Sequence, residues 1–434
     1  MQSSMSTFER LESEVRGYCR DFPTVFTKAR GSLLYGENGQ EYVDFFSGAG
    51  TLNYGHNHPS LKQALIHYLQ DDGVLHGLDM ATTAKRDFLE TFETLILEPR
   101  GYSYKIQFTG PTGTNAVEAA LKLARKVTGR TSIMACTNGF HGMTLGSVAA
   151  TGNTRHRNGS GIPLSHVTFI PYDGYLGSDV NTLDYVERLL SDPGSGIDLP
   201  AAIIVETVQG EGGVNVAGCE WLRGLELLCR KHHILLIIDD IQIGCGRSGD
   251  FFSFEAAGIS PDIVTLSKSL SGIGLPMSIV LIKPELDQWR PGEHTGTFRG
   301  NNLAFVTAAE TLRLFWRDDV LRRDVEAKSC LLQQRLEALS AQYPEAQAVV
   351  RGRGMLYGLA CSPPGLADRL ARIAFEKGLV IETSGASGQV VKCMPPLVID
   401  MALLQAGLDM LEQSMPEALA QTGRRQAELI GATQ

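Results

Sequence analysis

The sequence contains no long run of hydrophobic residues. A helix that crosses a membrane needs about 18 apolar residues in succession, and the longest apolar strand-like run here extends only from Ile234 to Ile238. The first residues (MQSSMSTFERLESEVRGYCRDFP) are polar and charged and lack the hydrophobic region of a secretory signal. We therefore expect a cytoplasmic protein without a membrane partner.

Zinc-site spacing and an excess of positive charge are also missing. The eight cysteines include no CxxC pair, and no cluster of cysteine and histidine has the spacing of a zinc site. The 39 Lys and Arg are outnumbered by 48 Asp and Glu, which leaves a formal net charge of −9. These patterns predict reduced thiols and no metal site, and they disfavour nucleic acid as a partner. A small anion held in a local pocket is still compatible with this charge.

From about residue 105 the chain alternates between short apolar segments and amphipathic segments. KIQFTG, TSIMACTN, AAIIVE, HILLIID and DIVTLSK predict strands, and TNAVEAALKLARKVTG predicts a helix that ends at Gly129. Strands without polar alternation are typical of a parallel sheet that is covered on both faces. The pattern predicts an α/β fold whose large domain, over 56–309, is doubly wound around a mostly parallel sheet.

A different pattern begins at about residue 310. Helices over 325–345 and in LADRLARIAFEKG alternate with strands in YGLACSP and VVKCMPPLVI, and a last helix follows. This predicts a smaller α+β domain over 310–434. Near the amino terminus, LYGENGQEYVDFFSG predicts two short strands joined by a turn at 37–39. We expect the segment 1–55 to pack with the small domain.

Charged residues directly follow three of the apolar strands. AAIIV is followed by Glu206, ILLII by Asp239 and Asp240, and DIVTL by Ser267 and Lys268. The carboxyl ends of parallel strands meet at one edge of an open α/β sheet, where ligands bind. Since a buried charge is costly unless it is paired, these residues indicate either a structural ion-pair cluster or a ligand site. The coincidence of three such strand ends favours the site.

An amine and a carboxylate at strand ends suit pyridoxal phosphate. This cofactor needs a lysine for a Schiff base, an acid beside its ring nitrogen, and a cradle for its phosphate. A candidate cradle is TGPTGTNAVEAALK, because Gly110 and Gly113 precede a helix whose N–H groups and dipole favour an anion. The segment is neither GxGxxG nor a P-loop, which disfavours dinucleotides and P-loop nucleotides.

Seven motifs carry a resemblance to a known family. In chain order they are GTNAVEAALKLAR, GFHGMTLG, VETVQGEGG, IIDDIQIGCGRSG, TLSKSLSG, GTFRGNNLA and MPPLVI. Together they resemble the class III, or ω-amino acid, aminotransferases of PLP fold type I, over about Tyr35 to Ile399. The variants DDIQ, FHGMTLGS and TFRGNNLAF look most like the diaminobutyrate–2-oxoglutarate transaminases, which begin ectoine biosynthesis.

The resemblance implies a role for each site residue. Lys268 resembles the Schiff-base lysine and the base that moves the substrate proton, and Asp239 would pair with the ring nitrogen. The other cofactor contacts that it implies come from Gly113 and Thr114 (phosphate), Phe140 (ring stacking) with His141 beside it, Glu206, Gln242 (ring 3-oxygen) and Thr297 (phosphate of the neighbouring subunit). The contact of Thr297 implies a homodimer or a higher homo-oligomer. Taken alone, Phe140 also suits a core position, and His141, Gln242 and Thr297 suit loop or surface positions.

Two departures from the family pattern concern substrate binding. Many members have an arginine after FHG, where this chain has Met143, and another two residues before the MPPL run, where it has Lys392 facing Glu211. Lysine cannot reproduce the two-pronged contact of arginine with a carboxylate. Arg299 is the candidate replacement anchor or, alternatively, a surface arginine at a dimer seam. The remaining charges of the candidate cradle helix are interpreted as surface charges, namely Glu118, Lys122, Arg125 and Lys126.

The expected reaction is a transfer of the amino group of L-glutamate to L-aspartate 4-semialdehyde, giving L-2,4-diaminobutyrate and 2-oxoglutarate. One alternative is another ω-aminotransferase, acting on ornithine, acetylornithine or 4-aminobutyrate. A second is decarboxylation or intramolecular amine migration with the same cofactor, and a third is a regulator that holds the cofactor without turnover. The diaminobutyrate could serve ectoine or a siderophore.

Overall fold

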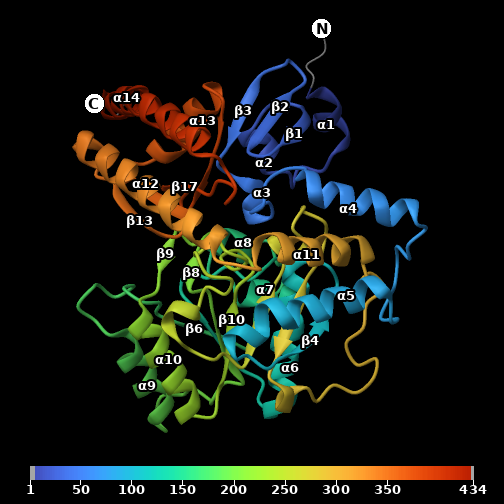
Figure 1. Ribbon diagram of the computed structural model, residues 1–434. Helices are drawn as coiled ribbons and strands as arrows, with labels where there is room; N and C mark the ends of the chain where they lie inside the picture. Colours follow the sequence, from blue (N-terminus) through green and yellow to red (C-terminus); the bar gives the residue numbers. More distant parts are fainter. Residues whose placement is uncertain (1–4, 432–434) are drawn as a thin grey trace.

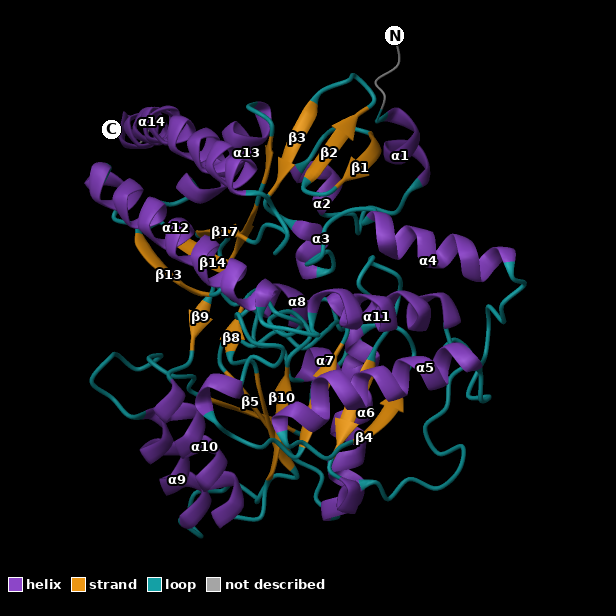
Figure 2. Cartoon of the chain, viewed as in Figure 1, coloured by secondary structure: helices purple, strands orange, loops and turns teal. Residues whose placement is uncertain are grey.

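The computed structural model describes residues 5–431, and one large sheet forms its centre (Figures 1 and 2). The seven strands lie in the order β4-β12-β11-β10-β7-β5-β6. Strands β11 to β6 are parallel to one another, whereas β12 is antiparallel to both of its neighbours. In chain order they are β4 (Lys105–Phe108), β5 (Ile133–Cys136), β6 (Val167–Ile170), β7 (Ala202–Val205), β10 (Leu235–Asp239), β11 (Ile263–Leu266) and β12 (Ile279–Ile282). The predicted α/β fold with a mostly parallel sheet is confirmed.

Helices cover both faces of this sheet. One face packs against α5, α10 and α11 through a core that includes Phe88, Leu225 and Phe305, and the other packs against α6 through Val117, Leu121 and further apolar residues. These helices are α5 (Thr83–Phe92), α6 (Gly113–Thr128), α9 (Thr182–Ser191), α10 (Cys219–Lys231) and α11 (Asn302–Phe315). Burial on both sides explains why β5, β7, β10 and β11 have no polar alternation.

Helix α6 ends where the sequence predicted. Gly129 has a φ of 68°, a left-handed conformation that glycine adopts without steric cost, and its N–H donates to the carbonyl of Arg125. Because the helix is amphipathic, one side is buried against the sheet while Lys122 and Lys126 lie on the exposed side. The first turn of α6, at Gly113 and Thr114, lies at the carboxyl ends of the strands.

A second layer of elements lies above the large sheet in Figure 1. Its four-stranded antiparallel sheet has the order β13-β14-β17-β16, and residues of three helices, α12, α13 and α14, contribute to its core. The elements are α12 (Val320–Gln342), β13 (Val349–Arg353), β14 (Leu356–Ala360), α13 (Leu366–Glu376), β16 (Glu382–Ser384), β17 (Val390–Cys393) and α14 (Met401–Gly431). The predicted strand VVKCMPPLVI is shorter than expected. It ends at Cys393, because Pro395 and Pro396 have no N–H to donate to a sheet.

The amino-terminal strands join this second layer. Strand β3 pairs in parallel with β15, so that Val43 faces Leu379 across the ladder. The strands of this sheet are β1 (Phe26–Arg30), β2 (Leu33–Gly36), β3 (Glu41–Asp44) and β15 (Leu379–Val380), and the smaller elements nearby are α1 (Ser6–Leu11), α2 (Tyr18–Asp21), α3 (Ser47–Gly50) and α4 (Pro59–Gln70). This pairing places the amino-terminal strands beside the second layer, whereas the proposed boundary at 309/310 falls within helix α11. The domain boundaries stay a proposal.

Two further findings bear on the environment of the protein. Among the residues that the structure describes, no helix is both long and apolar enough to cross a membrane. All eight cysteines are free, and five of them are buried.

Candidate active site

A cavity of about 170 Å³ lies at the carboxyl ends of the central strands. All eight residues that were predicted to contact the cofactor within one subunit line it, together with Glu211 and two others. The lining residues are Gly113, Thr114, Phe140, His141, Gly142, Glu206, Glu211, Asp239, Ile241, Gln242 and Lys268. The parallel sheet brings these residues together because its strands all end at the same edge.

Lys268 lies one residue beyond the end of β11, in a turn of 3-10 helix (Lys268–Ser271). Its φ is 47°, so a non-glycine residue is held in the left-handed region at this point. Its Nζ donates a hydrogen bond to the carbonyl of Ala49 at 2.8 Å. Burial lowers the pKa of the Lys268 amine, although the nearby Glu211 carboxylate opposes this shift. A lowered pKa favours the neutral amine that a Schiff base requires.

The hydrogen bond from Lys268 to the Ala49 carbonyl was not predicted from the sequence. Ser47, Gly48, Ala49 and Gly50 all have positive φ values, so the chain makes a left-handed turn there. Asp44 stabilises the turn by accepting the N–H groups of Phe46 and Ser47, each at 2.8 Å. The glycine-rich run SGAG was the available signal for such a turn.

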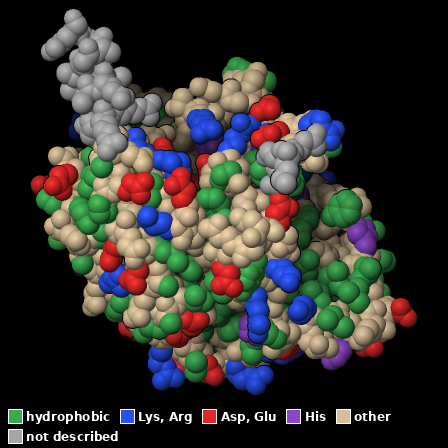
Figure 3. Space-filling view, turned by 90° about the horizontal axis from the view of Figure 1, so that it is seen from above, with side chains coloured by type: hydrophobic (Ala, Val, Ile, Leu, Met, Phe, Trp, Pro, Cys, Tyr) green, Lys and Arg blue, Asp and Glu red, His purple; other side chains and the backbone are tan. Residues whose placement is uncertain are grey.

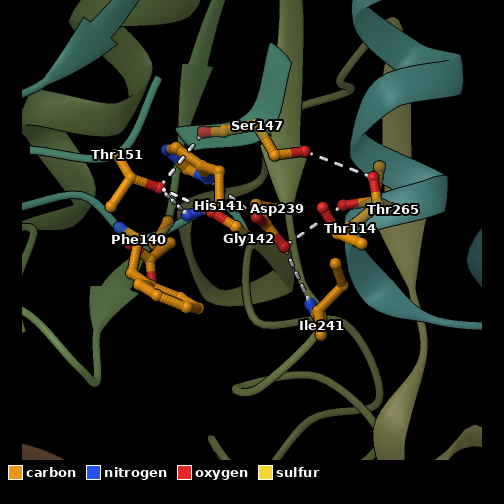
Figure 4. A network of polar contacts seen from close by, with 10 residues as sticks. Thr114, Phe140, His141, Gly142, Ser147, Thr151, Asp239, Ile241 and Thr265 are labelled. Atoms are coloured by element: carbon orange, nitrogen blue, oxygen red, sulfur yellow. Dashed lines mark hydrogen bonds and ion pairs between the residues drawn. The ribbon is translucent and has the colours of Figure 1, made fainter. Parts of the chain in front are cut away.

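Asp239 ends β10, and three groups hold its carboxylate in place (Figure 4). Oδ2 lies 2.7 Å from Nδ1 of His141, and Oδ1 accepts bonds from the hydroxyl of Thr265 and the N–H of Ile241 at 3.2 Å each. Burial lowers the pKa of His141, but the hydrogen bond and charge of Asp239 outweigh burial, so that the pKa is raised overall. An oriented carboxylate is what a protonated ring nitrogen needs as its partner.

Glu206 directly follows the neighbouring strand β7 and contacts the loop that carries Phe140. Its Oε2 accepts the main-chain N–H of Phe140 at 2.9 Å. Burial raises the pKa of the Glu206 carboxyl to about 8, and the charge of Asp239 adds to this effect. The side chain therefore holds the loop while retaining its proton at neutral pH.

The first turn of α6 forms an anion cradle. Among the described residues, the N–H groups of Gly113 and Thr114 donate to no protein acceptor, as expected of the first helical positions. A Cβ atom on Gly113 would lie 3.1 Å from Ile241, so glycine keeps the cradle open. These features fit a phosphate.

Glu118 corrects one of the sequence interpretations, because it is not a free surface charge. Its Oε1 accepts the hydroxyl of Thr144 at 2.5 Å and the N–H of Ser147 at 3.1 Å, and the Thr144 hydroxyl contacts that of Thr114 at 2.6 Å. Glu118 thus joins the cradle helix to α7 (Leu145–Ala149). The spacing of four residues from Thr114, one helical turn, was the signal that could have indicated this.

The residues of the cavity fit pyridoxal phosphate as a set. A lysine amine, an oriented carboxylate and an anion cradle border one cavity, and Phe140 supplies an aromatic ring. Two buried polar atoms, Nε2 of His141 and Oε1 of Gln242, have no hydrogen-bond partner among the described residues. Such atoms are expected where a polar ligand binds.

Lys392 and Glu211 meet as the sequence suggested. Nζ of Lys392 lies 2.7 Å from Oε1 of Glu211 and 2.8 Å from Oε1 of Glu382, and no part of the lysine side chain is exposed. Gln242 also donates to Oε1 of Glu211, at 2.9 Å. The position of Glu382 was not anticipated, since its strand β16 is only three residues long.

Three other residues lie outside this cavity. Arg299 forms an ion pair with Asp79 and donates to the carbonyl of His294 at 3.2 Å. Thr297 is exposed, and Met143 is 54% exposed. Within one subunit, therefore, the structure does not bring Arg299 or Thr297 to the lysine.

A comparison with protein families agrees with this geometry. The family model described as "Aminotransferase class-III" matches residues 17–415. The chain is a class III aminotransferase. Enzymes of this family depend on pyridoxal phosphate, and this aminotransferase therefore uses that cofactor.

Curated relatives and solved structures extend the comparison. The aminotransferase is 61% identical over 418 residues to the diaminobutyrate–2-oxoglutarate transaminase of Bordetella parapertussis, with 96% of each chain covered. It is 57% identical over 415 residues to that of Halomonas elongata, covering 95% of this chain and 99% of the relative. The ornithine aminotransferase of Toxoplasma gondii has a similar structure, with a TM-score of 0.82 at 27% identity over 96% of this chain and 95% of that one. A Bacillus anthracis aminotransferase also has a similar structure, with a TM-score of 0.85 at 25% identity over 95% of this chain and 98% of that one.

Proposed function

We propose that this aminotransferase moves the amino group of L-glutamate to L-aspartate 4-semialdehyde, giving L-2,4-diaminobutyrate and 2-oxoglutarate. The observation that carries the proposal is the high identity, over nearly the whole chain, to relatives named diaminobutyrate–2-oxoglutarate transaminases. A terminal aldehyde suits an ω-specific site, because the reacting carbon is the one farthest from the α-carboxylate.

The roles of the residues follow from their positions. Pyridoxal phosphate, when bound, supplies an aldehyde that bonds to amines and a ring that accepts electrons. Lys268 would be the amine that meets that aldehyde and the base that moves the proton at the reacting carbon of the substrate, and its lowered pKa suits both tasks. Asp239, oriented by His141, would hold a negative charge beside the ring nitrogen, and Gly113 and Thr114 would hold the phosphate at the first turn of α6.

Phe140, Glu206 and Gln242 complete the cofactor site in this proposal. Phe140 would contact the ring, and Glu206 fixes the loop that carries Phe140. Gln242 donates to Ala49 and Glu211 through its amide nitrogen, so it would give up one of these bonds to donate to a ring oxygen of the cofactor.

A homodimer or a higher homo-oligomer completes the site in this proposal. Hydrophobic side chains gather on the right-hand side of Figure 3, where α4 lies in Figure 1. In the segment 66–80 several large apolar side chains are exposed: Ile66, Leu69, Val74, Leu75, Leu78 and Met80. An exposed apolar surface of this kind favours association. Thr297 would reach the phosphate of the neighbouring subunit, and Arg299 would anchor a substrate carboxylate there.

We further infer that the enzyme works in the cytoplasm and supplies diaminobutyrate for ectoine. Eight free cysteines are compatible with a reducing compartment. A siderophore pathway would use the same product, so the genomic neighbourhood or the metabolites that accumulate on deletion would decide between them.

A screen of amino donors and acceptors tests the proposed reaction. The holoenzyme is mixed with L-glutamate and a set of ω-aldehydes, and separately with diaminobutyrate, ornithine, acetylornithine and 4-aminobutyrate, while the absorbance of the cofactor is recorded. The highest kcat/KM is expected for the pair of glutamate and aspartate semialdehyde. Faster turnover of ornithine or 4-aminobutyrate would assign another ω-aminotransferase, and release of CO₂ would assign a decarboxylase.

A further inference from the structure

Lys392 is shared between two carboxylates, of which only one borders the cofactor cavity. Glu211 lies at 2.7 Å and Glu382 at 2.8 Å from the same Nζ atom. Lys392 has no exposed side-chain surface, Glu382 is 6% exposed and Glu211 is 25% exposed. The accessible member of the cluster is therefore a carboxylate and not the amine.

The strands fix this arrangement from two sides. Glu382 on β16 is directly opposite Lys392 on β17 in the antiparallel ladder. Glu211 follows β8 (Val208–Gln209), and its main-chain carbonyl accepts the N–H of Gly385, which comes just after β16. Cross-strand neighbours of opposite charge stabilise each other. Moving Lys392 toward a substrate would thus leave Glu382 buried without its cation, which is unfavourable.

The charge of the cluster favours a cation as its ligand. The ammonium of Lys392 faces two carboxylates, so the cluster carries an excess of negative charge when Glu382 is ionised and none while Glu382 holds its proton. Burial opposes the ionisation of Glu211, but Lys392 and Lys268 outweigh this effect and lower the pKa of Glu211 to about 2. Burial raises the pKa of Glu382 to about 7 despite Lys392. Glu211 is consequently the member that remains ionised throughout the neutral pH range.

One oxygen of Glu211 is free for a ligand. Oε1 accepts the bonds from Lys392 and Gln242, whereas Oε2 accepts no hydrogen bond from the described residues. Glu211 also borders a second cavity of about 210 Å³, which shares Phe140 with the cofactor cavity. Polar side chains of Asn138, Asn153 and His156 line that second cavity, so it suits the charged end of an amino acid.

We propose that Glu382 is a positioning residue that holds Lys392 against Glu211, and that Glu211 thereby offers its second carboxylate oxygen to the α-ammonium group of the substrate. The inference rests on the proposed function, since it assumes a substrate that reacts at its ω-end. It assigns Glu211 to recognition of an ammonium group, and it makes Lys392 unavailable as an anchor for a substrate carboxylate.

A comparison of two amine substrates distinguishes the contact with the α-ammonium group from the other substrate contacts. 4-Aminobutyrate is 2,4-diaminobutyrate without its α-ammonium group, and the two share the ω-amine and the carboxylate. The ratio of their kcat/KM values therefore reports on recognition of the α-ammonium group alone. A hydrogen bond to a charged partner changes such a ratio by about 10- to 100-fold.

The experiment compares Glu211→Gln, Glu382→Gln, Glu382→Asp and a control, Asp368→Asn. Asp368 lines the surface cavity behind Glu382 and bonds to Thr383, so its replacement removes a nearby charge without touching Lys392. We expect Glu211→Gln to lower kcat/KM for diaminobutyrate about 10- to 100-fold, mainly through KM, with 4-aminobutyrate nearly unaffected. Glu382→Gln is expected to lower the ratio of kcat/KM for diaminobutyrate to that for 4-aminobutyrate, but by less than Glu211→Gln does. Glu382→Asp should give a ratio between those of Glu382→Gln and the wild type. The control Asp368→Asn should leave the ratio unchanged.

A binding measurement accompanies the kinetics. Cofactor-loaded Lys268→Ala protein is titrated with each amine by calorimetry, since this variant binds amines without turnover. Adding Glu211→Gln should raise the Kd of diaminobutyrate about 10-fold and leave that of 4-aminobutyrate unchanged. Equal losses for both amines in both experiments, or no preference for diaminobutyrate in the wild type, would overturn the inference while amino transfer stands. Absence of turnover with every ω-amine would instead overturn the proposed function.

Discussion

Nδ1 of His141 lies 2.7 Å from Oδ2 of Asp239, and the two residues come from different layers of the site, a loop after β5 and the end of β10. Both side chains are buried, with at most 4% exposed. The contact with His141 restricts the rotation of the Asp239 side chain, so that the carboxylate has a fixed orientation. The acid that the sequence pattern identified thus depends on a histidine 98 positions away.

Replacing His141 tests this dependence. His141→Ala removes a charge-assisted hydrogen bond from a buried carboxylate, so we expect the Kd for pyridoxal phosphate to rise about 10-fold or more. His141→Gln should recover part of the affinity, because its amide can donate to Asp239. Fluorescence titration of cofactor-free protein measures both values, and an unchanged Kd in the alanine variant would mean that Thr265 and Ile241 suffice to hold Asp239.

Lys268→Ala should abolish turnover and the visible absorbance that the wild-type holoenzyme shows. Among the residues that the structure describes, no other lysine lines the cavity, so a loss of at least about 1,000-fold in kcat is expected for removal of both nucleophile and base. Borohydride reduction followed by peptide mapping locates the lysine that carries the cofactor. Labelling at another position would refute the assignment.

Gly142→Ala should weaken phosphate binding. Gly142 has a φ of 121°, and a Cβ there would lie 2.4 Å from the Thr114 hydroxyl, so the cradle must shift. The matched control is Gly129→Ala, which also has a positive φ but meets no atom within 4 Å. We expect a Kd for pyridoxal phosphate raised about 10-fold by the first change only, and a stability cost of about 1 kcal/mol from the second. Equal cofactor affinities in the two variants would contradict the role of the cradle.

Glu206 makes the stability of the cofactor-free protein depend on pH. Its pKa is raised, mainly by burial, to about 8, so the folded chain keeps a proton that the unfolded chain releases above about pH 4.5. Stability must therefore fall as pH rises, until the folded state also loses the proton near pH 8. Glu206→Gln lacks this effect and should gain about 2 kcal/mol relative to wild type between about pH 6 and about pH 8. Urea unfolding at several pH values measures the difference; a constant difference would show that Glu206 is ionised.

Arg299→Ala tests whether this arginine serves a substrate or only Asp79. If it anchors a carboxylate at the seam of a homodimer, KM for a carboxylate substrate should rise about 10-fold or more while kcat changes little. Asp79→Asn is the control, because it breaks the same ion pair and keeps the arginine. Similar kinetics in both variants and the wild type would leave Arg299 as a structural surface residue.

The sequence alone predicted the large sheet and most of the residues that line the cavity. Apolar strands that end in Glu206, Asp239 and Lys268 predicted one shared edge, because parallel strands all present their carboxyl ends there. The anion cradle was equally visible, since its glycines and its helix are contiguous in the chain. Local pattern and strand direction are sufficient for such residues.

Only the tertiary structure decided the contacts between distant segments. The Ala49 carbonyl reaches Lys268 across 219 positions, and Glu382 reaches Lys392 through a sheet whose register no local pattern specifies. Glu118, which looked like a surface charge, became a cradle residue once α7 packed beside it. Burying a carboxylate is costly unless donors surround it, and only the packing of neighbouring segments shows whether such donors are present.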